Sequence, residues 1–193
     1  MIRPFAARFA LAAFFAALSA PALAHTGHGT GGAVAGFVHP LLGLDHVLAM
    51  LAAGVFAARK GGMAHAAVPG AFMAAMLLGG FVAISELAIP AVETGIALSV
   101  ALLGLAIVFA ERIDARAGAL AAAVFGLFHG AAHGAELVDT TAFAPYALGF
   151  LAATGLLHAA GIALARVGAS LHAALPRQAG AAIFAAGALL LVV

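Results

Sequence analysis

Runs of about 20 apolar residues recur along this chain of 193 residues, and they constrain its fold more than any other feature. A helix of that length crosses the roughly 30 Å hydrocarbon core of a bilayer. Charged residues make up 8% of the chain, whereas a soluble domain has about 25%. The sequence therefore predicts an all-α polytopic membrane protein whose outer surface faces lipid.

We expect a signal peptide followed by six transmembrane helices. Residues 1–24 have the features of a secretory signal, with Arg3 and Arg8 before an apolar stretch and Ala22-Leu23-Ala24 as the cleavage site. The alternative is an uncleaved first helix, which leaves the topology of the rest unchanged. Three plus three spans give two halves of opposite topology, a pattern compatible with a 3+3 inverted repeat. The six-helix domain covers residues 25–193, with spans near 33–57, 65–85, 91–110, 117–136, 145–165 and 177–193.

The basic residues beyond the signal peptide fall in alternate loops between these spans. By the positive-inside rule those loops are cytoplasmic, so both mature termini lie outside the cytoplasm. We therefore expect a multi-pass protein of the bacterial inner membrane with periplasmic termini. No basic cluster indicates a nucleic-acid partner. The basic residues are Arg59, Lys60, Arg112, Arg116, Arg166 and Arg177.

The first span contains the motif HPLLGLDHVLAM, residues 39–50, which places His39, Asp45 and His46 inside an apolar run. Inserting an ionisable group at that depth costs roughly 2.5 to 3.5 kcal/mol, and a bound metal cation would offset the cost. The alternative for Asp45 and His46 is a buried hydrogen-bonded pair that serves packing alone.

The two histidines of this motif are seven residues apart, which is about 10 Å along a helix. They share one ion only if the helix is broken between them, and Pro40 and Gly43 favour such a break. Met50, four residues after His46, is a candidate weak soft ligand, with ordinary packing as the alternative.

The fourth span contains FGLFHGAAHGAE, residues 125–136, in which His129 and His133 are four residues apart. That spacing puts both imidazoles on one helical face, and Glu136 continues the stripe. Glycine at every fourth position, 126, 130 and 134, predicts a groove for close helix packing. His158, in the fifth span, is a further intramembrane histidine that we expect to act as a ligand or gate.

Across the membrane these groups are predicted to lie at several depths, which suits a moving ion better than a fixed one. Imidazole and carboxylate suit divalent nickel, cobalt, copper and zinc, while the absence of cysteine argues against a copper(I) site. Binding requires neutral histidine, so affinity should fall as the pH drops through ~6.5. Candidates for capturing ions at the mouth of the pathway are His25, His28, Glu86 and Glu93.

These motifs resemble the signatures of the HupE/UreJ family, hydrogenase and urease accessory membrane proteins regarded as nickel permeases. The resemblance includes the segments 39–50, 125–136 and 149–161 and covers most of the mature chain. It implies that the metal-handling residues are His39, Asp45, His46, His129, His133 and Glu136.

The leading hypothesis is uptake of Ni²⁺, or alternatively Co²⁺, for the maturation of nickel enzymes, by a protein that is not an enzyme and has no tightly bound cofactor. The chain has no phosphate-binding loop, so it is not expected to hydrolyse ATP, and its driving force or partner ATPase is left open. One alternative is an intramembrane metalloenzyme with a His/Asp zinc site. Another is an electron carrier that binds b-type haem through paired histidines.

Overall fold

A computed structural model describes residues 32–85, 87–137 and 142–192, and these ranges contain helices and no strand. The all-α prediction is confirmed for this part of the chain. The predicted signal peptide and the candidate residues His25, His28 and Glu86 lie outside the described residues. The α-helices are α2 (Ala33–Val38), α3 (Leu44–Lys60), α4 (Ala64–Ile84), α5 (Val92–Val108), α6 (Ala115–Ala135), α7 (Phe143–Leu171) and α8 (Leu175–Leu190), with 3-10 turns η1 (His39–Leu41) and η2 (Ala110–Arg112).

Three of these helices, α4, α6 and α7, are long and apolar enough to cross a membrane. The segment formed by α2 and η1, taken together with α3 as one broken span, is also long and apolar enough to cross a membrane. The described residues therefore contain up to four candidate membrane spans. Helix α5 is also apolar but has only 17 residues. Such helices indicate a membrane protein, while the predicted count of six spans and the inverted repeat stay predictions.

The first predicted span is sharply bent, by 86° between Ala33–Leu41 and Leu44–Lys60. Pro40 is the second residue of η1 and has no backbone N–H to donate, and Gly43 has extended backbone at the N-cap of α3. The break predicted from these two residues is therefore confirmed. It places His39 on one side of the bend and the pair Asp45–His46 on the other.

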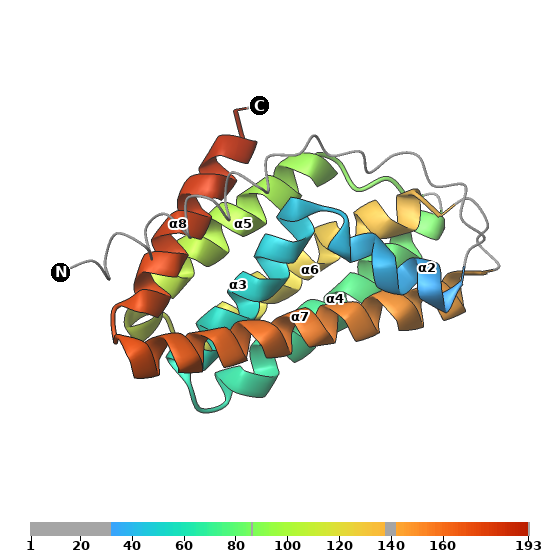
Figure 1. Cartoon of the computed structure of the whole chain (residues 1–193). Coiled ribbons are helices and arrows are strands. Elements are labelled where there is room, and N and C mark those ends of the chain that lie inside the picture. Colours follow the sequence, from blue (N-terminus) through green and yellow to red (C-terminus); the bar gives the residue numbers. More distant parts are fainter. Residues whose placement is uncertain (1–31, 86, 138–141, 193) are drawn as a thin grey trace.

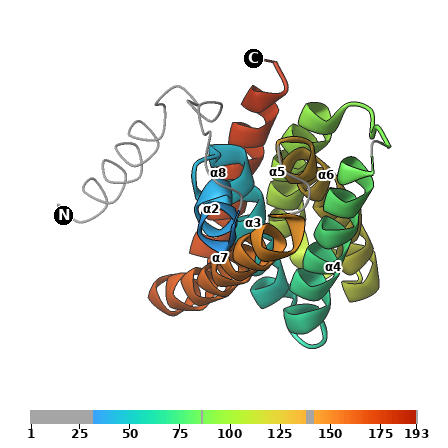
Figure 2. The ribbon, with the colours of Figure 1, turned by 90° about the vertical axis from the view of Figure 1, so that its right-hand side faces the viewer.

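Helix α3 lies inside the bundle, where it contacts α4, α5, α6, α7 and α8. Figures 1 and 2 show α3 surrounded by these helices, with α2 running beside the N-terminal half of α7. Helix α5 packs mainly against α8. Because α3 is central, the polar groups of its first turn face neighbouring helices and are partly shielded from the surroundings of the protein.

Among the described helices, α4 and α6 form the most extensive contact, and glycine allows them to approach each other. A Cβ atom added to Gly126 would overlap the carbonyl oxygen of Phe72, and one added to Gly130 would overlap that of Met76. Small residues allow two backbones to approach in this way inside a membrane. The packing groove predicted from the glycine spacing is confirmed, and it holds the histidine face of α6 at a set position relative to α4.

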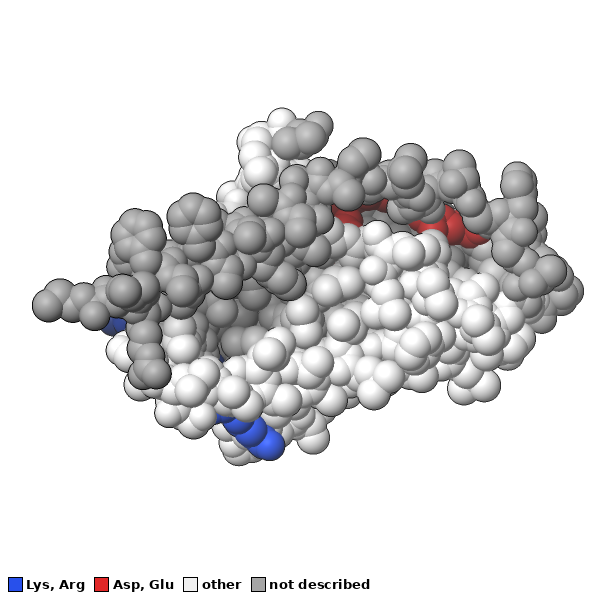
Figure 3. All heavy atoms as spheres, viewed as in Figure 1, with Lys and Arg blue, Asp and Glu red and all other residues white. Residues whose placement is uncertain are grey.

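Acidic and basic side chains lie near opposite edges of the face shown in Figure 3. The basic end includes Arg59 and Lys60, which end α3, and Arg116 in the first turn of α6. Arg59 forms an ion pair with Glu111 of η2. The pKa of Glu111 lies below its ordinary value, first because of a backbone hydrogen bond within the residue and then because of Arg59.

Helix α7 departs from the sequence prediction because it is much longer than the span 145–165. Arg166 was expected in a loop, but it lies inside this helix, which continues to Leu171. Its 29 residues extend for about 43 Å at 1.5 Å per residue, which exceeds the ~30 Å hydrocarbon core. No proline follows Arg166 within α7, so nothing in the local sequence ends the helix at the interface.

Candidate metal pathway

Four imidazole rings from η1, α3 and α6 contact one another in a continuous row. The centroid of the His39 ring lies 4.8 Å from that of His133, and the His46 centroid lies 4.7 Å from His133. The His46 centroid is also 4.8 Å from that of His129. We call the set His39, His133, His46 and His129 the imidazole row.

The row is assembled from two local patterns that meet across a helix interface. His129 and His133 are one helical turn apart and fully buried on the same face of α6. His46 lies in the first turn of α3, directly after the bend, and its ring contacts both of them. The bend also turns η1 back, so that His39 reaches His133 from the opposite side of the break.

A serine that the sequence analysis did not single out orients His129. The hydroxyl of Ser99 on α5 donates to the carbonyl oxygen of Ile96 at 2.6 Å and lies 2.8 Å from Nε2 of His129. Because a hydroxyl has one proton, Nε2 of His129 is the donor in the second contact. Its Nδ1 then has a free lone pair, and this atom is buried with no hydrogen-bond partner. The sequence signal that could have identified this residue is that Ser99 is the one serine in the apolar run of α5.

His158 on α7 is held in the same manner by the backbone of α3. Its Nδ1 lies 2.8 Å from the carbonyl oxygen of Met50, which can only accept, so Nδ1 is the donor. Nε2 of His158 is buried and has no hydrogen-bond partner. Met50 thus contributes its backbone, and its side chain belongs to the hydrophobic core.

Carboxylates hold two members of the imidazole row, His46 in its middle and His39 at its outer end. Oδ1 of Asp45 accepts from Nδ1 of His46 at 2.8 Å and from the His46 backbone N–H, also at 2.8 Å. Oε2 of Glu136 lies 2.8 Å from Nε2 of His39. Metal-binding imidazoles commonly donate one ring N–H to an oxygen in this way, which leaves the other nitrogen available to a metal.

Glu136 follows His133 by three residues and bonds to His39, whose ring contacts that of His133. It is the C-cap residue of α6, its backbone is still in the right-handed helical region, and its exposed side chain reaches His39. The structure therefore brings Glu136 to the outer end of the imidazole row. Whether any of these residues binds a metal stays a prediction.

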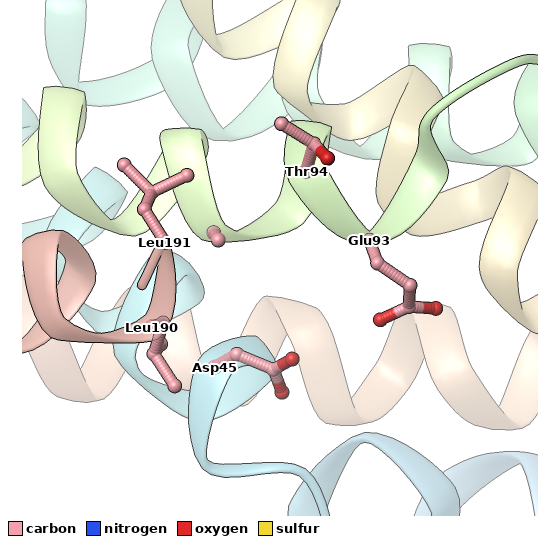
Figure 4. A pocket seen from close by; sticks show the side chains of 6 residues that line it. Asp45, Glu93, Thr94, Leu190 and Leu191 are labelled. Atoms are coloured by element: carbon pink, nitrogen blue, oxygen red, sulfur yellow. The ribbon is translucent and has the colours of Figure 1, made fainter. Parts of the chain in front are cut away.

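Asp45 also lines a pocket of about 250 Å³ between α3, α5 and the end of α8. Glu93, a sequence candidate for ion capture, lines the same pocket with Thr94, and Figure 4 shows both carboxylates directed toward this space. Two carboxylates beside one cavity raise the local concentration of cations. Asp45 joins the pocket to the imidazole row through its hydrogen bond to His46.

Within residues 32–85, 87–137 and 142–192, no group of three or more His, Asp or Glu side chains is arranged to hold one metal ion together. The described histidines of the row instead meet ring to ring, each next to one or two others.

Replacing Ser99 with alanine should weaken divalent metal binding without unfolding the protein. The loss of the hydroxyl frees the His129 ring to rotate or change tautomer, and such outer contacts are worth about 10- to 100-fold in affinity. Equilibrium dialysis of the purified variant with Ni²⁺ measures the change. Ser170→Ala, which removes an exposed hydroxyl on α7, is the matched control. Equal affinities in the two variants would contradict an orienting role for Ser99.

Comparison with known proteins gives two matches. The family model described as "HupE / UreJ protein" matches residues 12–190. Among curated relatives, "Protein HupE" from Rhizobium leguminosarum bv. viciae is 45% identical over 181 residues, which cover 92% of this chain and 94% of that protein. No solved structure matches the chain.

Proposed function

The chain belongs to the HupE/UreJ family, and from this premise we propose that it carries Ni²⁺ across the bacterial inner membrane into the cytoplasm. Co²⁺ is the alternative substrate, because imidazole and carboxylate ligands suit both ions. The ion would supply the maturation of nickel enzymes, as the family resemblance implies. In this proposal the metal is the cargo, and the membrane is crossed with both chain termini on the periplasmic side.

The imidazole row is the observation that carries this proposal. It lies in apolar helices, and its hydrogen bonds leave ring nitrogens of His129 and His133 buried and unpartnered. Because each imidazole contacts the next, an ion can exchange ligands one at a time. Conduction needs several sites that each bind weakly enough to release the ion.

The direction of movement follows from the placement of charge. The pocket lined by Asp45 and Glu93 lies at the start of α3, and Arg59 and Lys60 lie at its other end. By the positive-inside rule the basic end is cytoplasmic, so the acidic pocket faces the periplasm. Cations would gather in this pocket, enter the imidazole row and leave toward the basic end.

The same geometry favours transport over the two alternatives. A catalytic zinc site places three protein ligands around one ion, whereas no three His, Asp or Glu side chains of the described residues are arranged in that way. Two axial histidines of a haem lie on opposite faces of the porphyrin. The His46 ring is in direct edge contact with the rings of His129 and His133, which leaves no space for a porphyrin between them.

Uptake of radiolabelled Ni²⁺ into proteoliposomes containing the full chain tests the proposal. We expect saturable uptake above that of protein-free liposomes, and competition by Co²⁺ but not by Mg²⁺, which prefers oxygen ligands and keeps its waters. Uptake equal to the protein-free control, together with stoichiometric zinc that does not exchange, would favour the metalloenzyme and reject transport.

A further inference from the structure

The ring of Phe72, on α4, lies against both the inner end of the imidazole row and His158. Its centroid is 5.3 Å from that of His129 and 5.2 Å from that of His158. Phe72 is fully buried, and its backbone is held against Gly126 of α6. A phenyl ring offers no lone pair to a metal ion, so an ion moving from His129 to His158 must pass it.

Two further potential ligands, Thr154 and Met76, lie one helical turn from His158 and Phe72 in the direction away from the basic end of the bundle. Thr154 precedes His158 by one turn of α7, and Met76 follows Phe72 by one turn of α4. The Thr154 hydroxyl donates to Sδ of Met76 at 3.8 Å, and both residues are fully buried. An imidazole nitrogen without a partner, a thioether and a hydroxyl therefore occupy neighbouring turns of α4 and α7. Met76 packs on Gly130, beside His129, so this pair lies toward the imidazole row, and the inner ligand is Nε2 of His158.

We propose that Phe72 divides the pathway into two metal-binding positions: the imidazole row outside, and an inner site at Nε2 of His158. Displacement of the Phe72 ring is then the slow step between them, since apolar constrictions gate the passage of ions. This inference rests on the proposed function and adds to it a barrier residue and a second binding site.

Stopped-flow mixing of Co²⁺ with the purified full chain in detergent tests the division, because Co²⁺–imidazole complexes absorb visible light. We expect a fast phase from the imidazole row and a slow phase from the inner site. His158→Ala should remove the slow phase and leave the fast one. Phe72→Leu should accelerate the slow phase about tenfold by lowering the steric barrier, and Phe72→Tyr, which keeps the ring, should not.

Phe56→Leu is the matched control, because Phe56 is equally buried on α3 but packs on Gly118, away from the histidines. Thermal unfolding identifies folded variants, and Phe72→Ile gives the same test if the leucine variant is unstable. A single phase in the unmodified protein would overturn the inference. So would a slow phase that survives in His158→Ala or keeps its rate in Phe72→Leu. No absorbance change at all in the unmodified protein would instead reject metal handling itself, and with it the proposed function.

Discussion

Alanine at His46 or at His129 should abolish saturable nickel uptake by the reconstituted protein. His46 contacts both His129 and His133, so its removal interrupts the imidazole row in the middle. His129 ends the row beside Phe72, and its loss removes the ligand from which an ion would continue inward. Because loss of an outer-shell contact alone costs about 10- to 100-fold, we expect loss of a ligand to lower the uptake rate by about 100-fold or more.

His65→Ala is the control for this experiment. His65 lies in the first turn of α4, where its exposed ring bonds to a loop carbonyl and contacts no member of the imidazole row. Uptake by this variant should equal that of the unmodified protein at matched reconstitution levels. If His46→Ala or His129→Ala also transported nickel at the unmodified rate, the imidazole row would not be the pathway.

Alanine at Gly130 should prevent stable association of α4 with α6. The added methyl group would overlap three backbone atoms of Met76, and a backbone cannot rotate away as a flexible side chain can. Overpacking of this kind typically costs about 1–3 kcal/mol, and we expect an effect at the upper end or beyond because the contact is between backbones. Thermal unfolding in detergent should show a transition lowered by several degrees, or no folded protein.

Gly70→Ala is a matched control on α4 itself, because a Cβ atom there would meet no other atom within 4 Å. In a helix interior alanine is favoured over glycine by up to about 1 kcal/mol, so this variant should be as stable as the unmodified protein or more so. An unfolding temperature for Gly130→Ala that matched that of Gly70→Ala would show that α4 and α6 tolerate separation.

Apolar runs were enough to place the helices, since each run of about 20 residues can satisfy its backbone groups in a membrane only as a helix. The apolar runs were less informative about the residues at which the helices end. The extension of α7 past Arg166 to Leu171 was missed because an interface ends a hydrophobic span without ending a helix. The break after His39 was predictable, since proline and glycine act through local backbone geometry.

The sequence by itself determined which polar groups lie within apolar helices and which of them share a face. The pairing of His129 with His133 follows from the period of the helix alone. Only the tertiary structure decided that His46 meets this pair, that Ser99 orients His129, and that Phe72 stands before His158. Helical periodicity specifies a face within one helix. Which faces meet depends on how closely whole backbones pack, and here glycine allows α4 and α6 to come together beside α3.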